Sequence, residues 1–171
     1  MIDYPGLLRR TEQEAYETEH HLHNRERWFG KLGAQTATDW GDEASLTPYR
    51  AISGNGVFGA DANDEALVLG TDDTPAIAGM VSYDAHRLMI SAASTATDWI
   101  LRIIYGTGTM ADAETAGEYT DVMLTEAKKG VPVDVMMPRT TCASCKVWVR
   151  AKNATNDATI DFFIGIHEYE R

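Results

Sequence analysis

The sequence has little cysteine and no long hydrophobic segment. Two cysteines among 171 residues are too few for a disulfide framework. No apolar run approaches the roughly 20 residues that a membrane-spanning helix requires. The first residues, Met-Ile-Asp-Tyr-Pro-Gly, show no basic segment followed by an apolar one, so we predict no secretory signal. The chain is 44% hydrophobic and 24% charged, which is typical of a globular domain large enough to bury its own core.

Basic side chains are also scarce. Fifteen Lys and Arg residues stand against 26 Asp and Glu residues, so the formal net charge is −11. This excess argues against sequence-independent binding to nucleic acid, which depends on Lys and Arg neutralising phosphates. The acids concentrate in residues 39–126, where 15 of them accompany three arginines. Solubility explains this acidic middle most simply, and docking on a basic surface is the alternative.

The N-terminal region has the pattern of a helix. Thr11 and Glu14 have the spacing of a capping box, and helix-forming residues continue as far as Trp28, before Gly30. Apolar residues recur here at every seventh position: Leu8, Ala15, Leu22 and Phe29. A stripe this narrow is too thin to bury a helix in a core. We therefore predict a helix from Thr11 to Trp28 whose stripe contacts a neighbouring subunit or the outside of its own domain.

The remaining sequence changes to short apolar segments separated by turn residues. The clearest segments predict strands over residues 87–91, 99–105, 131–137, 146–152 and 159–167, and weaker ones cover residues 49–53, 66–70, 76–82 and 119–125. Residues 111–117 indicate one helical turn within a loop. Even spacing without intervening helices favours an antiparallel β-sandwich or jelly roll of about eight to nine strands. We expect an N-terminal helical arm (1–33), a linker loop (34–48) and a β-sandwich domain (49–171).

Residues 54–59 read Gly-Asn-Gly-Val-Phe-Gly, which matches the glycine spacing of a dinucleotide-binding loop. Such a loop opens a helix that receives a pyrophosphate. Here the following residues 60–65 contain three carboxylates, and no alternation of strands and helices follows. We interpret the segment as a glycine-rich turn.

Three further segments contain metal ligands in incomplete patterns. Cys142 and Cys145 form a single C-x-x-C pair before a strand, whereas zinc needs four ligands; His86 and His167 could add nitrogens only if the fold brought them close. Residues 19–23 read Glu-His-His-Leu-His but lack the histidine spacing of zinc enzymes. Residues 61–65 resemble the start of a calcium loop without its later glycine and glutamate. We predict that the cysteine pair lies at the entry to a strand, that residues 19–23 lie on a solvated helix face and that residues 61–65 form a turn. We predict no metal or other cofactor.

No catalytic pattern stands out. The chain lacks G-x-S-x-G, and paired carboxylates carry little information in so acidic a sequence. Trp40, Trp99 and Trp148 suit a sugar-stacking platform, but the last two lie within strand segments, where a core or interface role is the simpler interpretation. We therefore predict a protein that is not an enzyme.

The second half resembles the small jelly-roll head proteins of tailed bacteriophages, known as decoration or cement proteins. Four segments carry this resemblance: Tyr83–Ile90, Trp99–Gly106, Lys146–Asn153 and Phe162–Tyr169. The resemblance implies a virion structural protein on the capsid surface, made in the host cytoplasm, that forms a homotrimer and binds the shell of major capsid protein. It implies no catalytic residue. From the acidic charge and the lack of a long apolar run we expect no nucleic-acid or membrane partner. The alternatives are a carbohydrate- or receptor-binding jelly-roll module and a cupin-like enzyme.

Overall fold

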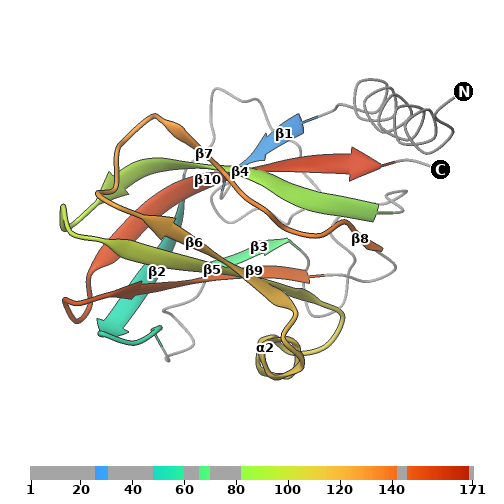
Figure 1. Ribbon diagram of the computed structural model, residues 1–171, viewed down its shortest axis with the longest axis horizontal. Helices are drawn as coiled ribbons and strands as arrows, with labels where there is room; N and C mark the ends of the chain where they lie inside the picture. Colours follow the sequence, from blue (N-terminus) through green and yellow to red (C-terminus); the bar gives the residue numbers. More distant parts are fainter. Residues whose placement is uncertain (1–25, 31–47, 60–65, 70–81, 142–145, 170–171) are drawn as a thin grey trace, which may run out of the picture.

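The computed structural model describes residues 26–30, 48–59, 66–69, 82–141 and 146–169 (Figure 1). Over these residues the protein is mainly β, with ten strands and one short helix. The elements in chain order are β1 (Glu26–Phe29), β2 (Tyr49–Asn55), β3 (Ala66–Leu69), β4 (Ser82–Ala93), β5 (Trp99–Gly106), α2 (Met110–Ala116), β6 (Tyr119–Leu124), β7 (Pro132–Asp134), β8 (Thr140–Thr141), β9 (Lys146–Asn153) and β10 (Thr159–Tyr169). No helix in this part of the chain is long and apolar enough to cross a membrane.

The strands form one curled sheet. Seven follow the order β6-β5-β9-β2-β10-β4-β7, while β1, β3 and β8 pair with β10, β9 and β4. The curl places β10, β4 and β7 in one half and β9, β5 and β6 in the other (Figure 1). Strand β2 belongs to both halves, because Tyr49–Ile52 pair antiparallel with β10 and Ser53–Asn55 pair parallel with β9. The sheet is therefore mixed, and the expectation of a purely antiparallel sheet was wrong at this strand.

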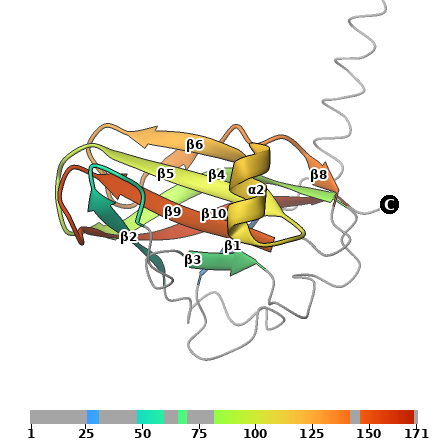
Figure 2. The ribbon, with the colours of Figure 1, turned by 90° about the horizontal axis from the view of Figure 1, so that it is seen from below.

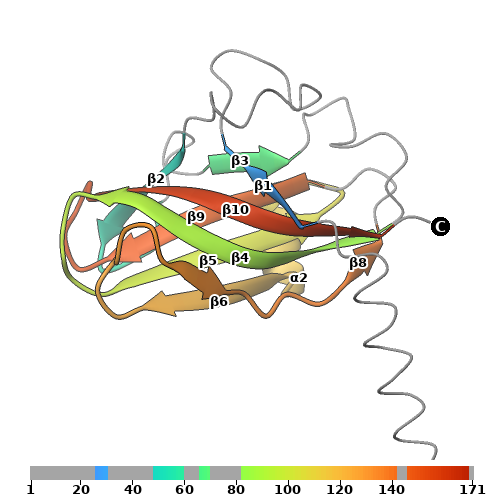
Figure 3. The same ribbon diagram turned by 90° about the horizontal axis from the view of Figure 1, so that it is seen from above.

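The two edges of the sheet approach each other. The chain between β7 and β8 passes β6 (Figure 3), and the hydroxyl of Thr120 on β6 donates a 3.1 Å hydrogen bond to the carbonyl of Met136 in that segment. This contact joins the edge of one half to the edge of the other.

The core lies between the two halves. Strand β10 turns Ile160, Phe162, Ile164 and Ile166 inward, and none of these side chains is exposed. Alternate residues of β4, β5 and β9 meet them in a single buried cluster. The period of two is the strand pattern expected from the sequence. Full burial of one such side chain contributes about 1.5–3 kcal/mol, so these strands carry most of the stability.

Helix α2 covers the outer face of the β5–β9 half (Figure 2). Its N-cap is Thr109, whose hydroxyl accepts a hydrogen bond from the amide of Asp112, and its C-cap is Gly117 at a φ of 79°. Ala113 packs against Ile104 and Trp148. The helical turn expected at residues 111–117 is thus confirmed, and it buries the outward side chains of two neighbouring strands.

Most expected strands are confirmed, with two corrections. Residues 131–137 form only the three-residue strand β7, and the helix predicted as far as Trp28 was wrong at its end. Glu26–Phe29 form strand β1, which pairs with Ile164–His167 of β10. Helix propensity is a weak local preference, and pairing with a central strand overrides it. The rest of that predicted helix, the linker and the segment 76–81 lie outside the described residues.

Candidate functional site

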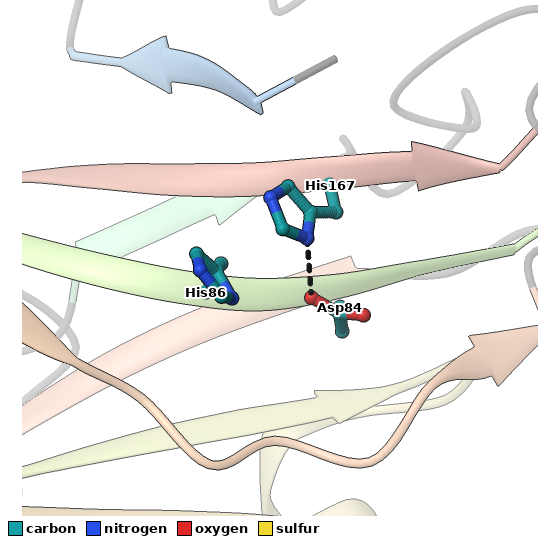
Figure 4. Close-up of side chains that lie close together, drawn as sticks. All are labelled: Asp84, His86 and His167. Carbon is teal, nitrogen blue, oxygen red and sulfur yellow. Dashed lines mark ion pairs between the residues drawn. The ribbon is translucent and has the colours of Figure 1, made fainter. Parts of the chain in front are cut away.

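Asp84, His86 and His167 come together on the outer face of the β4–β10 half (Figure 4). The two imidazole rings stack with their centroids 4.0 Å apart and an interplanar angle of 24°. Nδ1 of His167 lies 3.6 Å from Oδ1 of Asp84. One nitrogen or oxygen of each side chain lies within 4.8 Å of those of the other two. Two imidazoles and a carboxylate form a ligand set that divalent transition metals use.

The pairing of β4 with β10 positions this cluster, and it contains an irregularity at His86. His167 is the direct cross-strand partner of Asp84, and Ile166 faces Ala85. The next pair, Gly165 with Arg87, skips His86, which is therefore the extra residue of a β-bulge. Asp84 and His86 are two positions apart on β4, so the ordinary alternation of a strand places both on the face that His167 occupies. The bulge makes Arg87, rather than His86, the residue opposite Gly165.

Neighbouring backbone holds the bulge in place. The amide of Val135 donates a 2.7 Å hydrogen bond to the carbonyl of His86, the extra residue of the bulge. On the other side, Gly165 adds no side chain next to the two imidazoles. The backbone thus fixes where His86 leaves the strand.

The three side chains differ in burial. His167 is only 3% exposed, whereas Asp84 and His86 are partly exposed. A buried imidazole needs polar partners, and the nearby carboxylate of Asp84 supplies one. The partly exposed members leave the cluster accessible from the surface.

A second polar cluster, formed by Arg102, Glu114, Asp121 and Arg150, fastens helix α2 to the sheet. Arg102 donates two 2.8 Å hydrogen bonds to the carboxylate of Asp121 and a third to Glu114. Its pKa is raised above the ordinary value, chiefly by the hydrogen bonds that it donates to Asp121, with Glu114 adding to the effect. Arg150 donates to the same Glu114 at 2.6 Å. These groups bond to one another, which is typical of a structural network rather than a reactive site.

Apolar side chains are exposed near the edges of the sheet. Met136 is 90% exposed, Met123 on the edge strand β6 is 75% exposed and Val131, directly before β7, is 52% exposed. All three belong to the segments that meet at the Thr120–Met136 hydrogen bond. We call these three residues the seam surface.

The structure tests only part of the sites considered from the sequence. Leu8, Ala15 and Leu22 lie outside the described residues, and Phe29 is in strand β1, not on a helix. The histidine-rich segment 19–23, the acidic segment 61–65, the two cysteines and Trp40 also lie outside. Gly54 and Asn55 end strand β2, and the chain then bends at residues 56–57, with Gly56 at a φ of 68°. The expected turn is thus confirmed only after Asn55.

Trp99 and Trp148 are 1% and 6% exposed, so neither can stack on a sugar in this structure. The core role expected for both is confirmed. The structure does bring His86 and His167 close, which the sequence left open, and it adds Asp84. The only signal for Asp84 was its position two residues before His86, which places both on one face of a regular strand.

Comparisons of the chain with protein-family models, with curated proteins and with solved structures give no match.

Proposed function

We propose that this chain is a structural protein that acts through contacts with copies of itself and with a protein shell, as a capsid decoration protein does. The observation that carries the proposal is the seam surface. Large apolar side chains on edge segments are unusual in a monomer, because edge strands offer unpaired backbone groups to other chains and are normally protected by charge. Methionine is enriched at protein interfaces.

A second copy of the chain is the occupant that we assign to the seam surface. The carboxylates of the acidic segment 39–126 and the surplus of basic residues in 127–171 give a copy two unlike regions that attract each other. The seam surface contains residues from both regions, since Met123 belongs to the first and Met136 to the second. Association there suits the homotrimer implied by the phage resemblance.

The molar mass in solution tests the proposal. We expect light scattering behind a sizing column to give an oligomer for the intact chain and a smaller mass for Met136→Lys and Met123→Lys. Lysine reduces the net negative charge, so added repulsion between acidic chains cannot cause the loss. Val57→Lys is the control, because Val57 is 57% exposed but lies in the glycine-rich turn. A monomeric intact chain, or equal masses for all variants, contradicts self-association through the seam surface.

Binding to a shell is a separate experiment. We expect the intact oligomer to co-sediment with empty capsids and the Met136→Lys variant to remain in the supernatant. If a confirmed oligomer binds no capsid, the protein assembles but does not decorate.

A further inference from the structure

We propose that Asp84, His86 and His167 form a binding site for a divalent transition-metal ion of the Zn²⁺ class, which links strands β4 and β10. This inference stands independently of the proposed function. It starts from the ligand chemistry. Two neutral imidazoles and one carboxylate suit Zn²⁺ and its first-row neighbours, whereas Ca²⁺ and Mg²⁺ prefer sites made of oxygen alone.

The geometry requires only a small adjustment of side chains. Ligand atoms bound at about 2.1 Å in a tetrahedral arrangement lie roughly 3.4 Å apart. The corresponding atoms here lie within 4.8 Å of one another, and Nδ1 of His167 is already 3.6 Å from Oδ1 of Asp84. Rotation of the partly exposed His86 away from its stacked position is the main movement required. The backbone of the cluster can stay as it is.

The positions of the ligands on the sheet support a fixed site. Asp84 and His167 are paired across two strands that share ten paired residues. His86 leaves β4 at a bulge whose carbonyl is bonded to Val135. Ligands on paired strands lose less conformational freedom on binding than ligands on loops. Three protein ligands leave a fourth position for water, which reaches the site from its exposed side.

The test must separate this site from the histidine-rich segment 19–23. We therefore use the full chain with His20, His21 and His23 replaced by alanine as the background protein. In this background we expect Zn²⁺ titration calorimetry to show one ion bound per chain. We also expect Zn²⁺ to raise the Tm by about 5 °C or more, because an ion that binds only the folded state stabilises it. Ca²⁺ should produce neither effect.

Two substitutions then identify the ligands. His86→Asn and Asp84→Asn, made in the same background, should each weaken Zn²⁺ binding more than tenfold and abolish the rise in Tm. Both side chains are partly exposed, so neither substitution should disturb the packing of the core. Asp157→Asn is the control, since it neutralises an exposed carboxylate on the turn before β10, at the other end of that strand from His167. It should bind Zn²⁺ as the background does.

Two results would overturn the proposal. One is a background protein that binds no Zn²⁺ at 100-fold excess of the ion over protein. The other is Zn²⁺ binding that His86→Asn and Asp84→Asn leave unchanged. A spectroscopic readout adds an independent criterion: Cu²⁺ bound to the background should show nitrogen hyperfine coupling in its electron paramagnetic resonance spectrum. That coupling should weaken in His86→Asn, and a spectrum equal to that of the background contradicts the site.

Discussion

Arg150 on β9 donates a 2.6 Å hydrogen bond from Nη1 to Oε2 of Glu114, and this bond ties helix α2 to the middle of the sheet. The other carboxylate oxygen of Glu114 accepts from Arg102 on β5. One acid on a short helix therefore holds two arginines from two neighbouring strands. The side chains of the three residues are between 15% and 20% exposed, so water replaces these bonds poorly if they are broken.

Glu114→Ala should destabilise the protein. The guanidinium groups of Arg102 and Arg150 lose the carboxylate that they share, at a site where little water can replace it. We therefore expect the free energy of unfolding to fall by about 2 kcal/mol. Urea denaturation measures it. Asp98→Ala serves as the control because the Asp98 side chain is exposed, and it should change the stability by less than about 0.5 kcal/mol. Equal effects of both variants would mean that the network contributes nothing specific.

Tyr83→Phe should leave the stability unchanged or increase it. Tyr83 is fully buried, and its hydroxyl has no hydrogen-bond partner among the described residues. Removing a buried hydroxyl that makes no bond removes a desolvation cost, while phenylalanine keeps the ring. We expect a gain of about 0–2 kcal/mol in the free energy of unfolding at pH 7. A loss of more than about 1 kcal/mol would show that the hydroxyl is bonded in solution.

The same variant should alter the response to alkaline pH. Burial raises the pKa of Tyr83 in the folded state well above the ordinary value of about 10, with smaller contributions from Tyr105 and Glu118. Below pH 10 the residue is neutral in both states. Above pH 10 only the unfolded chain ionises it, so the stability falls as the pH rises. Denaturation between pH 9 and 11 should show a shallower fall for Tyr83→Phe, and parallel curves would refute this assignment.

Asn153→Ala should be strongly destabilising. The side chain is 2% exposed; its amide donates to the hydroxyl of Thr97 and the carbonyl of Asp98, and its oxygen accepts from the amide of Thr155. Alanine removes three partly buried hydrogen bonds of about 1 kcal/mol each, so we expect a loss of about 2–3 kcal/mol. The matched control is Asn156→Ala, since Asn156 is exposed on the same turn. Thermal melting should show a lower Tm for Asn153→Ala and an unchanged Tm for Asn156→Ala.

Removing the N-terminus should reveal the contribution of β1. A chain that begins at Glu26 retains all four residues paired with β10, whereas one that begins at Lys31 loses them. Deleting residues 26–30 as well removes the strand that pairs with Ile164–His167. We therefore expect the protein that begins at Lys31 to be clearly less stable than the one that begins at Glu26. Hydrogen exchange at Ile164 and Ile166 should accelerate only in the second. If both truncations behave alike, β1 adds no stability.

The sequence predicted this fold to different degrees in different elements. Strands β5 and β9 were predicted almost to their ends because their apolar residues alternate and turns flank them. The clear prediction of β4 covered only residues 87–91, since the bulge at His86 breaks the alternation after the first four residues of the strand. Strand β1 was predicted as helix, because its partner lies more than 130 residues further along the chain. Local patterns carry no information about such distant pairing.

The candidate site was beyond sequence reasoning for the same reason. His86 and His167 are separated by 80 residues, and their meeting depends on the register of β4 with β10. A shift of that register by one residue would turn His167 to the other face of the sheet. A sequence pattern shows which residues share a face of one strand, but it does not fix which residue of a distant strand lies opposite.

The position of β10 has a consequence for synthesis on the ribosome. It is the last of the described strands in chain order, yet it pairs with β1, β2 and β4 and supplies four core side chains. At about 5–20 residues per second, the nascent chain waits seconds with its earlier strands made and their central partner missing. Until residue 169 has left the exit tunnel, Leu88 and Ile90 have no β10 to pack against. This protein therefore completes its fold only after translation has passed β10, and chaperones that shield apolar strands should bind its nascent chain.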